Sequence, residues 1–245
     1  MKTIAILATY PARVNTFPEA LQSLATQVDE AFVILNQYDR IPEGSFPRNA
    51  QFIIPQDNLK DTGKFFVPVE PDDFVVLCDD DIVYPKDYVS SLRAKWEDYS
   101  TLHAVVGVHG VIYSDFFDGN PQARIVHVFH CKLDADLFVN QLGTGTVLCK
   151  GYQLPPFEFM QTSARFVDVR FARHCAQAAF PQICVAREND WMHQLPTETS
   201  IFNSFTTGWD LSIVREVQSF AGLRFLPTLL PANSILVNSA QRACG

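Results

Sequence analysis

Three consecutive aspartates, Asp79, Asp80 and Asp81, stand directly after an apolar run at residues 74–78. Such a run is typical of a buried strand in a parallel sheet. Three adjacent carboxylates cannot all be ionised unless a cation or strong hydrogen-bond donors lie nearby. Because these ligands are all oxygens, the pattern predicts a site for Mg²⁺ or Mn²⁺. The alternative is a solvated acidic turn in front of the next helix.

A second polar segment, Asp61-Thr62-Gly63-Lys64, precedes this run in the chain. A lysine can bind a phosphate as a point charge. Lys64 is favoured over Lys60 because Gly63 leaves the backbone beside it unhindered. The sequence therefore predicts a contact between Lys64 and a phosphate group, although a solvated loop with scattered charges explains the composition equally well.

Asp168 lies near the start of a predicted amphipathic helix, in which Val167, Phe171 and Cys175 share one face. A carboxylate in the first helical turn interacts favourably with the helix dipole. A carboxylate is also a group that takes up a proton in general base catalysis. On the residues alone, the stabilising role is the preferred one.

The segments that must position these residues alternate between apolar runs and helical patterns, as in βαβ units. Strands are predicted at residues 3–8, 31–35, 51–54, 74–78, 104–113, 125–130, 142–148 and 183–186, and helices at 16–28, 85–96 and 166–178. This order predicts an α/β fold with a Rossmann-like, mixed but mostly parallel sheet flanked by helices. Ligands of such sheets bind beyond the carboxyl ends of the strands, where the three aspartates fall.

Composition sets broad limits on the class of protein. A chain of 245 residues with 47% hydrophobic and 19% charged residues suits one domain with a large core. The net charge of -8 argues against nucleic acid as the main partner. Six cysteines without a C-x-x-C pair predict reduced thiols and a cytoplasmic location. No apolar run is long enough to span a bilayer, while attachment to a membrane surface stays open.

Taken together, these pieces resemble glycosyltransferases of the GT-A fold, closest to the inverting family-2 type. The resemblance covers roughly residues 1–195. It rests on five motifs in the expected order: Thr9-Tyr10-Pro11-Ala12-Arg13 after the first strand, Asp61-Thr62-Gly63-Lys64, Leu77-Cys78-Asp79-Asp80-Asp81 with Pro85 as the D-x-D motif, the turn Gly143-Thr144-Gly145, and Asp168 at a helix start.

The resemblance implies a metal-dependent transfer of a sugar from a UDP-, GDP- or dTDP-sugar to a glycan or lipid-linked acceptor, as in polysaccharide biosynthesis. It implies a role for each matching residue. The nucleotide-sugar donor would be held by Thr9, Tyr10, Arg13, Asn36, Asp61, Lys64, Asp79 and Asp80, the metal by Asp79, Asp81 and His193, and the acceptor by Gly143, Thr144 and Trp191, with Asp168 as catalytic base. One departure concerns the base, because a Glu-Asp pair is usual in the family and this chain has Val167-Asp168.

The resemblance also implies a single GT-A domain. Residues 1–100 would form the nucleotide-sugar-binding half, 101–195 the acceptor-binding half, and 196–245 a C-terminal extension without an assigned task. Two enzyme alternatives share strand-end aspartates: a nucleotidyltransferase, which usually has a glycine-rich basic loop after its first strand, and a haloacid-dehalogenase phosphatase, whose motif lies near the amino terminus. A further alternative is a nucleotide- or sugar-binding module without turnover.

Overall fold

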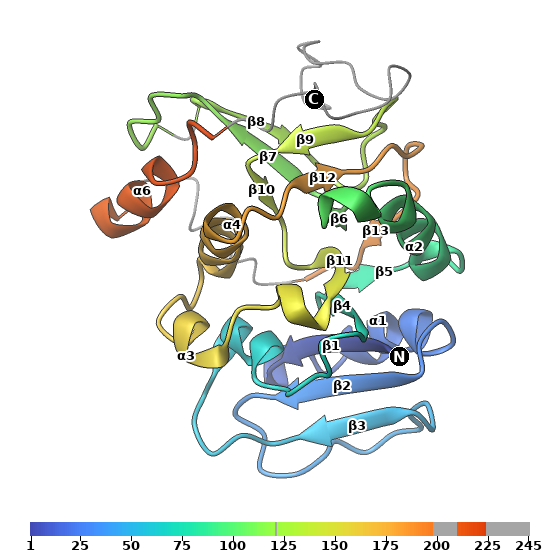
Figure 1. Cartoon of the computed structure of the whole chain (residues 1–245). Helices are drawn as coiled ribbons and strands as arrows, with labels where there is room; N and C mark the ends of the chain where they lie inside the picture. Colours follow the sequence, from blue (N-terminus) through green and yellow to red (C-terminus); the bar gives the residue numbers. More distant parts are fainter. Residues whose placement is uncertain (121, 198–209, 224–245) are drawn as a thin grey trace.

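The computed structural model describes residues 1–120, 122–197 and 210–223. An eight-stranded mixed sheet forms its centre (Figure 1). In spatial order the strands are β3 (Ala50–Ile53), β2 (Glu30–Leu35), β1 (Thr3–Thr9), β4 (Phe74–Cys78), β11 (Thr146–Lys150), β6 (Val105–Gly107), β12 (Gln182–Cys184) and β9 (Leu137–Val139). The predicted α/β class with a Rossmann-like, mostly parallel sheet is confirmed.

The direction of the strands defines where ligands bind. β3, β2, β1 and β4 run parallel to one another, whereas β11 is antiparallel to both β4 and β6. The chain proceeds from β1 outward through β2 to β3, and then returns to place β4 on the other side of β1. The strand order therefore reverses between β1 and β4, and the crevice beyond the carboxyl ends of two such strands is the usual binding place of open α/β sheets.

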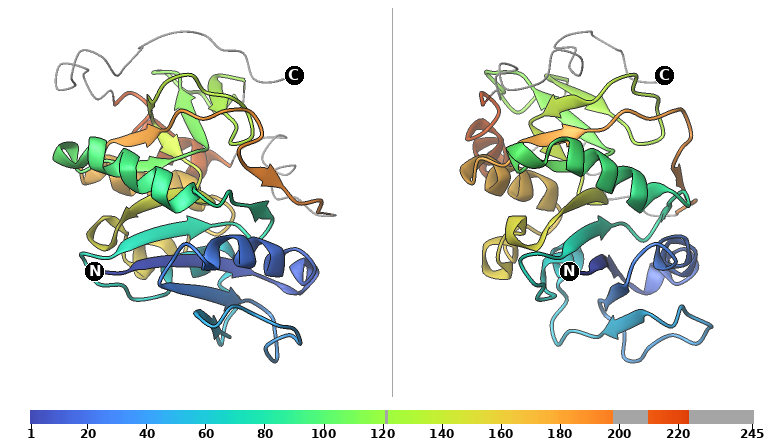
Figure 2. Two further views of the ribbon diagram at one scale, coloured as in Figure 1. Left: turned by 90° about the vertical axis from the view of Figure 1, so that its right-hand side faces the viewer. Right: turned by 45° about the vertical axis from the view of Figure 1, so that its right-hand side comes forward.

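Helices cover both faces of the sheet because its strands are apolar on both faces (Figure 2). In β4, Val75 and Leu77 enter one hydrophobic cluster while Val76 enters the other, and all three are fully buried. Each such side chain contributes roughly 1.5–3 kcal/mol by leaving water. One face carries α1 (Phe17–Ala25) and α2 (Tyr88–Asp98), and the opposite face carries η2 (Lys60–Phe65), α3 (Phe157–Met160) and α4 (Val167–Gln177).

A second, smaller sheet is formed by strands that follow α2 in the sequence. Its strand order is β10 (Gln141–Leu142), β7 (Gly110–Tyr113) and β8 (Arg124–His127). Helix α6 (Leu211–Gln218) packs against this sheet and α4 through a third apolar cluster that includes Val169, Val214 and Val217. The Arg170 guanidinium on α4 also donates to the Glu216 carboxylate on α6, with Nε–O distances of 2.9 and 2.8 Å. The described part of the C-terminal extension is thus fixed to α4.

The strand predicted at 104–113 is wrong as a single element, because it divides between two sheets. β6 ends at Gly107 in the central sheet and β7 begins at Gly110 in the smaller one. The Val108 N–H is shared between the Thr146 carbonyl at 3.2 Å and the Thr146 hydroxyl at 3.3 Å, and the His109 N–H donates to that hydroxyl at 3.0 Å. A Cβ at position 107 would lie 2.9 Å from the Thr146 carbonyl oxygen, so the close approach at this break requires glycine.

The remaining elements are short. They are β5 (Ile82–Val83), which pairs with β13 (His193–Gln194), and the single turns η1 (Pro11–Arg13), η3 (Ser100–Leu102) and η4 (Gly151–Gln153). Helix α2 begins at Tyr88, later than the predicted residue 85, because the Tyr88 N–H bonds the Pro85 carbonyl outside the helix.

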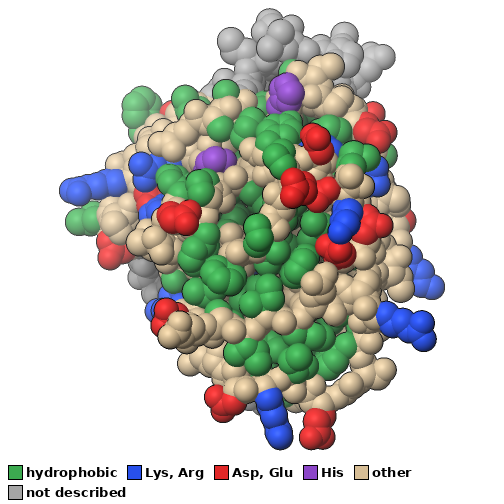
Figure 3. All heavy atoms as spheres, turned by 60° about the horizontal axis from the view of Figure 1, so that its bottom comes forward, with side chains coloured by type: hydrophobic (Ala, Val, Ile, Leu, Met, Phe, Trp, Pro, Cys, Tyr) green, Lys and Arg blue, Asp and Glu red, His purple; other side chains and the backbone are tan. Residues whose placement is uncertain are grey.

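The surface contains apolar regions as well as charged ones. Figure 3 turns the free edge of β3 toward the viewer and shows apolar side chains gathered there between scattered charges. Ile54, directly after β3, is 41% exposed, and Phe66 is 42% exposed while packing edge to face on Phe157. None of the helices in the described ranges combines the length and the apolar composition needed to cross a bilayer.

Candidate active site

The three aspartates lie at the carboxyl end of β4, at the point where the strand order reverses. Two cations face them. The Lys64 ammonium bonds the Asp79 carboxylate, and the Arg13 guanidinium lies 3.4 Å from Asp81 and 3.9 Å from Asp80. The side chains of Asp80 and Asp81 are nearly buried, at 12% and 13% exposure, whereas that of Asp79 is 43% exposed. The three aspartates therefore form a partly buried polar site with paired cations, and not the solvated acidic turn that the sequence left as an alternative.

Lys64 is the central cation of the site. It is 4% exposed, and its Nζ also lies 3.4 Å from the Thr144 carbonyl oxygen. Burial alone would lower the pKa of Lys64, but nearby carboxylates, Asp79 foremost, outweigh burial and raise the pKa above its ordinary value. The ammonium is therefore charged near neutral pH, and the loop interpretation of this segment does not describe its buried position.

The turn between β10 and β11 forms the opposite wall of the site. A Cβ at Gly145 would lie 1.9 Å from the Asp79 carboxylate, so only glycine leaves that carboxylate its place. The buried Tyr84 hydroxyl accepts the Asp79 N–H at 2.8 Å and donates to the Gly145 carbonyl at 2.7 Å. These contacts fix Asp79 against the turn.

Gly145→Ala is expected to displace the Asp79 carboxylate and break its bond with Lys64. A charge-assisted hydrogen bond is worth roughly 1.5–3 kcal/mol, so Mn²⁺-dependent binding of nucleoside diphosphates should weaken about ten- to hundredfold by calorimetry. Gly222→Ala is the matched control, because its added methyl group would meet nothing nearer than 4.0 Å. Unchanged binding by Gly145→Ala would show that Asp79 takes no part.

Asp168, in the first turn of α4, faces the same turn from the other side. Its Oδ1 accepts the Thr144 hydroxyl at 2.6 Å and the Thr144 N–H at 2.8 Å. Burial raises the pKa of Asp168, while the two bonds from Thr144 oppose that rise. Both bonds from Thr144 use Oδ1 and reach across to another element instead of capping α4, which leaves Oδ2 without a hydrogen bond from the described residues.

The Asp61 carboxylate binds a backbone group of the protein itself. Its two oxygens accept the Arg165 N–H at 3.0 and 2.9 Å. Arg165 has a φ of 75°, in the left-handed region that side chains other than glycine rarely adopt. Asp61 therefore holds the loop that leads into α4 and Asp168. A contact between Asp61 and the donor stays a prediction, because both oxygens of this carboxylate already accept the Arg165 N–H.

The loop after β1 supplies the second half of the site. The Thr9 hydroxyl is buried and makes no hydrogen bond of ordinary geometry within the described ranges, although it is near enough to Asp80 to lower the pKa of that carboxyl. Burial, with help from the Asp81 charge, raises the pKa of Asp80 to about 7, although the Thr9 hydroxyl and the Arg13 charge oppose the rise. The Tyr38 hydroxyl donates to the Tyr10 carbonyl at 3.2 Å. A buried hydroxyl without a partner is a group that a bound ligand could satisfy.

Asn36, directly after β2, has its amide occupied by the backbone at the start of η2. The side chain donates to the Lys60 carbonyl at 3.0 Å and accepts the Leu59 N–H at 2.9 Å. Its predicted contact with the nucleotide stays a prediction. The observed role of Asn36 is to hold the segment that carries Lys64.

β13 brings Gln194, and not His193, to the aspartates. The Leu195 N–H donates to the Asp81 carbonyl at 2.7 Å, and the Gln194 amide lies 3.4 Å from the Asp81 carboxylate. Successive side chains of a strand point to opposite faces, so His193 is directed away from Asp81. His193 is exposed, and its proposed use as a metal ligand finds no support in this arrangement.

The carboxylates offer a metal ion a partial set of ligands. Within the described ranges, no group of three or more His, Cys, Asp or Glu side chains is placed to hold a metal. The exposed Asp79 carboxylate and Asp81 supply oxygen donors of the kind that Mg²⁺ and Mn²⁺ prefer. Mg²⁺ is often held by one or two carboxylates together with substrate phosphates and water. The residues fit an ion whose coordination a diphosphate completes.

The predicted acceptor residues separate into two places. Gly143 and Thr144 lie beside Asp168, in the turn before β11. Trp191 packs on Tyr88 of α2, with ring centroids 5.8 Å apart, and donates to Asp87 at 3.3 Å. It belongs to the apolar cluster on the opposite face of the sheet from α4. The structure does not bring Trp191 to Gly143 and Thr144.

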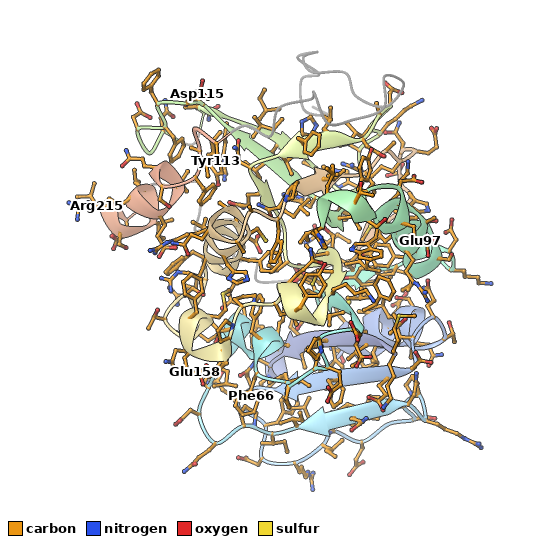
Figure 4. All side chains as sticks on the ribbon, in the orientation of Figure 1. Phe66, Glu97, Tyr113, Asp115, Glu158 and Arg215 are labelled. Carbon is orange, nitrogen blue, oxygen red and sulfur yellow. The ribbon has the colours of Figure 1, made fainter. Side chains whose placement is uncertain are left out.

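A separate hollow of about 340 Å³ lies at the tip of the β7–β8 hairpin, lined by residues 115–118 and Gln218. Figure 4 shows Asp115 at this tip, above the central sheet. The hollow lacks the buried Lys64 and the convergent carboxylates found beyond β1 and β4. The strand ends are therefore the stronger candidate for chemistry.

Comparisons with known proteins give no family. No protein-family model matches the chain, and no curated protein sequence matches it. Among solved structures, the chain is similar to the mannose-6-phosphate isomerase from Helicobacter pylori, with 10% identity and a TM-score of 0.39. The similarity covers 78% of this chain and 90% of that one.

Proposed function

We propose that this protein is a metal-dependent glycosyltransferase of the GT-A type that moves a sugar from a nucleotide-sugar donor to a hydroxyl of a glycan or lipid-linked acceptor, with inversion. One observation carries the proposal. Asp79, at the end of β4, and Asp168, at the start of α4, come from distant parts of the sequence and meet around Lys64 and Thr144. The Asp79 carboxylate is 43% exposed, whereas the Asp168 carboxylate is half-buried and hydrogen-bonded, so the two are suited to different roles.

The donor half of the proposal rests on the reversal of strand order between β1 and β4. The unpartnered Thr9 hydroxyl and the Arg13–Asp80 pair are assigned to the nucleoside. Lys64 is assigned to the diphosphate, which would compete with Asp79 for the ammonium. A metal held by Asp79 and Asp81 would neutralise charge that develops on the departing diphosphate.

The acceptor half of the proposal rests on Asp168. Oδ2 takes the proton of the attacking hydroxyl, while the two bonds from Thr144 hold the carboxylate in position. Attack from the side opposite the diphosphate inverts the anomeric carbon. The buried thiols of Cys78, Cys149, Cys175 and Cys184 suit the reducing cytoplasm. A glycan or lipid-linked acceptor allows work at the cytoplasmic face of a membrane.

A thermal-shift screen of UDP, GDP and dTDP with and without Mn²⁺ tests the donor half. A ligand at a hundred times its dissociation constant stabilises the native state by about 2.7 kcal/mol. One diphosphate should raise the melting temperature, and Mn²⁺ should enhance the rise. The matching nucleotide sugars are then assayed for donor hydrolysis and for transfer to methyl glycosides. No stabilisation by any diphosphate, together with no turnover, would refute the proposal.

The same screen separates the alternatives. Metal-dependent binding without hydrolysis or transfer would indicate a binding module without turnover. Release of pyrophosphate from a nucleoside triphosphate and a sugar phosphate would indicate a nucleotidyltransferase. Asp81→Ala tests the metal, because it removes a predicted metal ligand; its melting temperature is measured alongside, since Asp81 also pairs with the buried Arg13 guanidinium at 3.4 Å.

Asp61→Ala is expected to lower kcat about tenfold or more and leave the donor KM nearly unchanged. Its carboxylate holds the Arg165 N–H in front of α4, so its loss disturbs Asp168 and not the donor. Asp61→Asn keeps one accepting oxygen and should restore most of the turnover. A rise in donor KM with constant kcat would instead favour direct contact between Asp61 and the donor.

A further inference from the structure

His109 lies in the break between β6 and β7, against the turn that holds Asp168 and Asp79. Its N–H donates to the Thr146 hydroxyl at 3.0 Å, and its carbonyl accepts the Gly143 N–H at 2.9 Å. A Cβ at Gly143 would lie 3.2 Å from the imidazole ring. The ring therefore stands beside the residue next to Thr144, which binds Asp168. The hydrogen bonds of its backbone N–H and carbonyl hold residue 109 in this position.

No hydrogen bond among the described residues explains why an imidazole stands at this position. Within the described ranges neither ring nitrogen has a hydrogen-bonding protein partner, and neither is among the fully buried polar atoms that lack one. The residue is half-buried, and its ring lies 6.3 Å from that of Phe129. A polar ring held in place by backbone, yet left without a partner, is suited to contact a ligand.

The charge state of this ring limits what it can bind. Burial lowers the pKa of His109 to about 4, with help from Arg187, Arg124 and His130, while Asp79 opposes the change. The imidazole is neutral near pH 7. A neutral imidazole offers one donor and one acceptor, which matches hydroxyl groups, since each hydroxyl can both donate and accept.

We propose that His109 contacts the acceptor and selects a hydroxyl-bearing, uncharged sugar group there. The inference rests on the proposed function and names the substrate class at its acceptor side. Asp168 receives the proton of the reacting hydroxyl on one side of the turn, and His109 binds another hydroxyl of the same sugar on the other side. His109 is thus a specificity-determining residue, distinct from the base.

The substitution that separates binding from packing is His109→Phe. Phenylalanine keeps a ring against Gly143 and Phe129 but removes both nitrogens. His174→Phe is the matched control, because His174 lies in the last turn of α4, at the far end from Asp168. Transfer from the nucleotide sugar to methyl glycosides is compared with donor hydrolysis in the full chain.

His109→Phe should lower kcat/KM for the acceptor about tenfold or more, the effect of one lost hydrogen bond. Donor hydrolysis should stay at the wild-type rate, and His174→Phe should change neither. His109→Gln, which retains a donor and an acceptor, should recover part of the loss. Transfer at the wild-type rate by His109→Phe would overturn the proposal.

A second measurement keeps this inference separate from the proposed function. The full chain with ¹⁵N-labelled histidine is titrated with methyl glucoside, galactoside and mannoside, and the ring resonances are assigned through His109→Gln. A shift of the His109 ring nitrogens supports sugar recognition even if no nucleotide sugar is turned over. If the wild type shows no turnover and no glycoside shifts these resonances, the His109 proposal fails together with the proposed function.

Discussion

Asp168→Asn is expected to reduce turnover by roughly a hundredfold or more, the usual contribution of a positioned general base. The asparagine oxygen can still accept both bonds from Thr144, so the shape of the site is kept. What disappears is the carboxylate oxygen that takes the proton. Donor affinity should change little, because the carboxylate acts on the acceptor. Turnover and melting temperature are measured on the same preparation.

A structural role for Asp168 leads to a different pattern. The protein would melt at a lower temperature while turnover per folded molecule stayed at the wild-type value. In that case the base lies elsewhere, and the acids next considered from the sequence are Asp134 and Glu158. Asp134 pairs with Lys132 at 60% exposure, and Glu158 lies exposed on α3, as Figure 4 shows. None of the contacts within the described ranges brings either acid to the turn at Thr144.

Acidity should act on activity and stability in opposite directions through Asp168. Its pKa is raised in the folded protein, chiefly by burial, so it protonates there more readily than in the unfolded chain. Turnover is expected to fall as the pH drops through this raised value, because the protonated carboxyl accepts no proton. Over the range between the folded and unfolded pKa values, the same protonation favours the folded state. Asp168→Asn should remove the contribution of Asp168 to both dependences, whereas the contribution of Asp80, whose pKa burial raises to about 7, should remain.

The fold was predictable where burial on two faces dictates the residue types. Residues 74–78 are apolar without interruption because neighbouring side chains enter opposite apolar clusters. The division of 104–113 between two sheets was not predictable from hydrophobicity. Its local signal is the pair Gly107 and Gly110, since an isolated glycine in a strand pattern indicates a bulge or a close backbone approach.

The site was predictable in its acids and less so in its contacts. The position of Asp79 to Asp81 follows from a rule about strand ends that needs no knowledge of the rest of the chain. The partners of Asp61 and Asn36 are backbone groups of other segments, which side-chain patterns do not reveal. Gln194 reaches Asp81 only because β13 pairs with β5 in one register, and a shift by one residue would present His193 instead.

For Lys64, the sequence indicated a possible ligand but not the surroundings of the side chain. Its flanking Gly63 suggested a lysine near a phosphate, and the structure adds that the lysine is buried among carboxylates. A Cβ at Gly63 would lie 2.9 Å from Ile34 on β2, so this glycine lets η2 pack closely on the sheet. Close packing carries Lys64 into the site, where its charge has two uses: balancing acids and meeting a phosphate.

Lys64→Met should therefore have the largest effect on stability among these variants. It fills a similar volume but leaves the nearby carboxylates, Asp79 first, without their cation. Because the Asp79 side chain is 43% exposed, water can solvate it, and the loss should be about 1.5–3 kcal/mol, the range for a hydrogen bond to a charged group. The pKa values of Asp61 and Asp168, which burial already raises, should rise further without the opposing Lys64 charge, so the variant should regain stability as the pH falls. Denaturant unfolding at several pH values measures both effects, with Lys60→Met, at an exposed position, as control.

Lys64→Arg distinguishes the two uses of the charge. It restores a cation for the acids, so much of the lost stability should return, but its larger planar group does not occupy the position of the ammonium. If Lys64 reaches the diphosphate, donor affinity should remain weakened about tenfold or more in the arginine variant. Full recovery of both stability and donor affinity would mean that position 64 supplies only charge. An unchanged unfolding free energy in Lys64→Met would contradict the ion pair between Lys64 and Asp79, and with it the arrangement of carboxylates on which the proposed site depends.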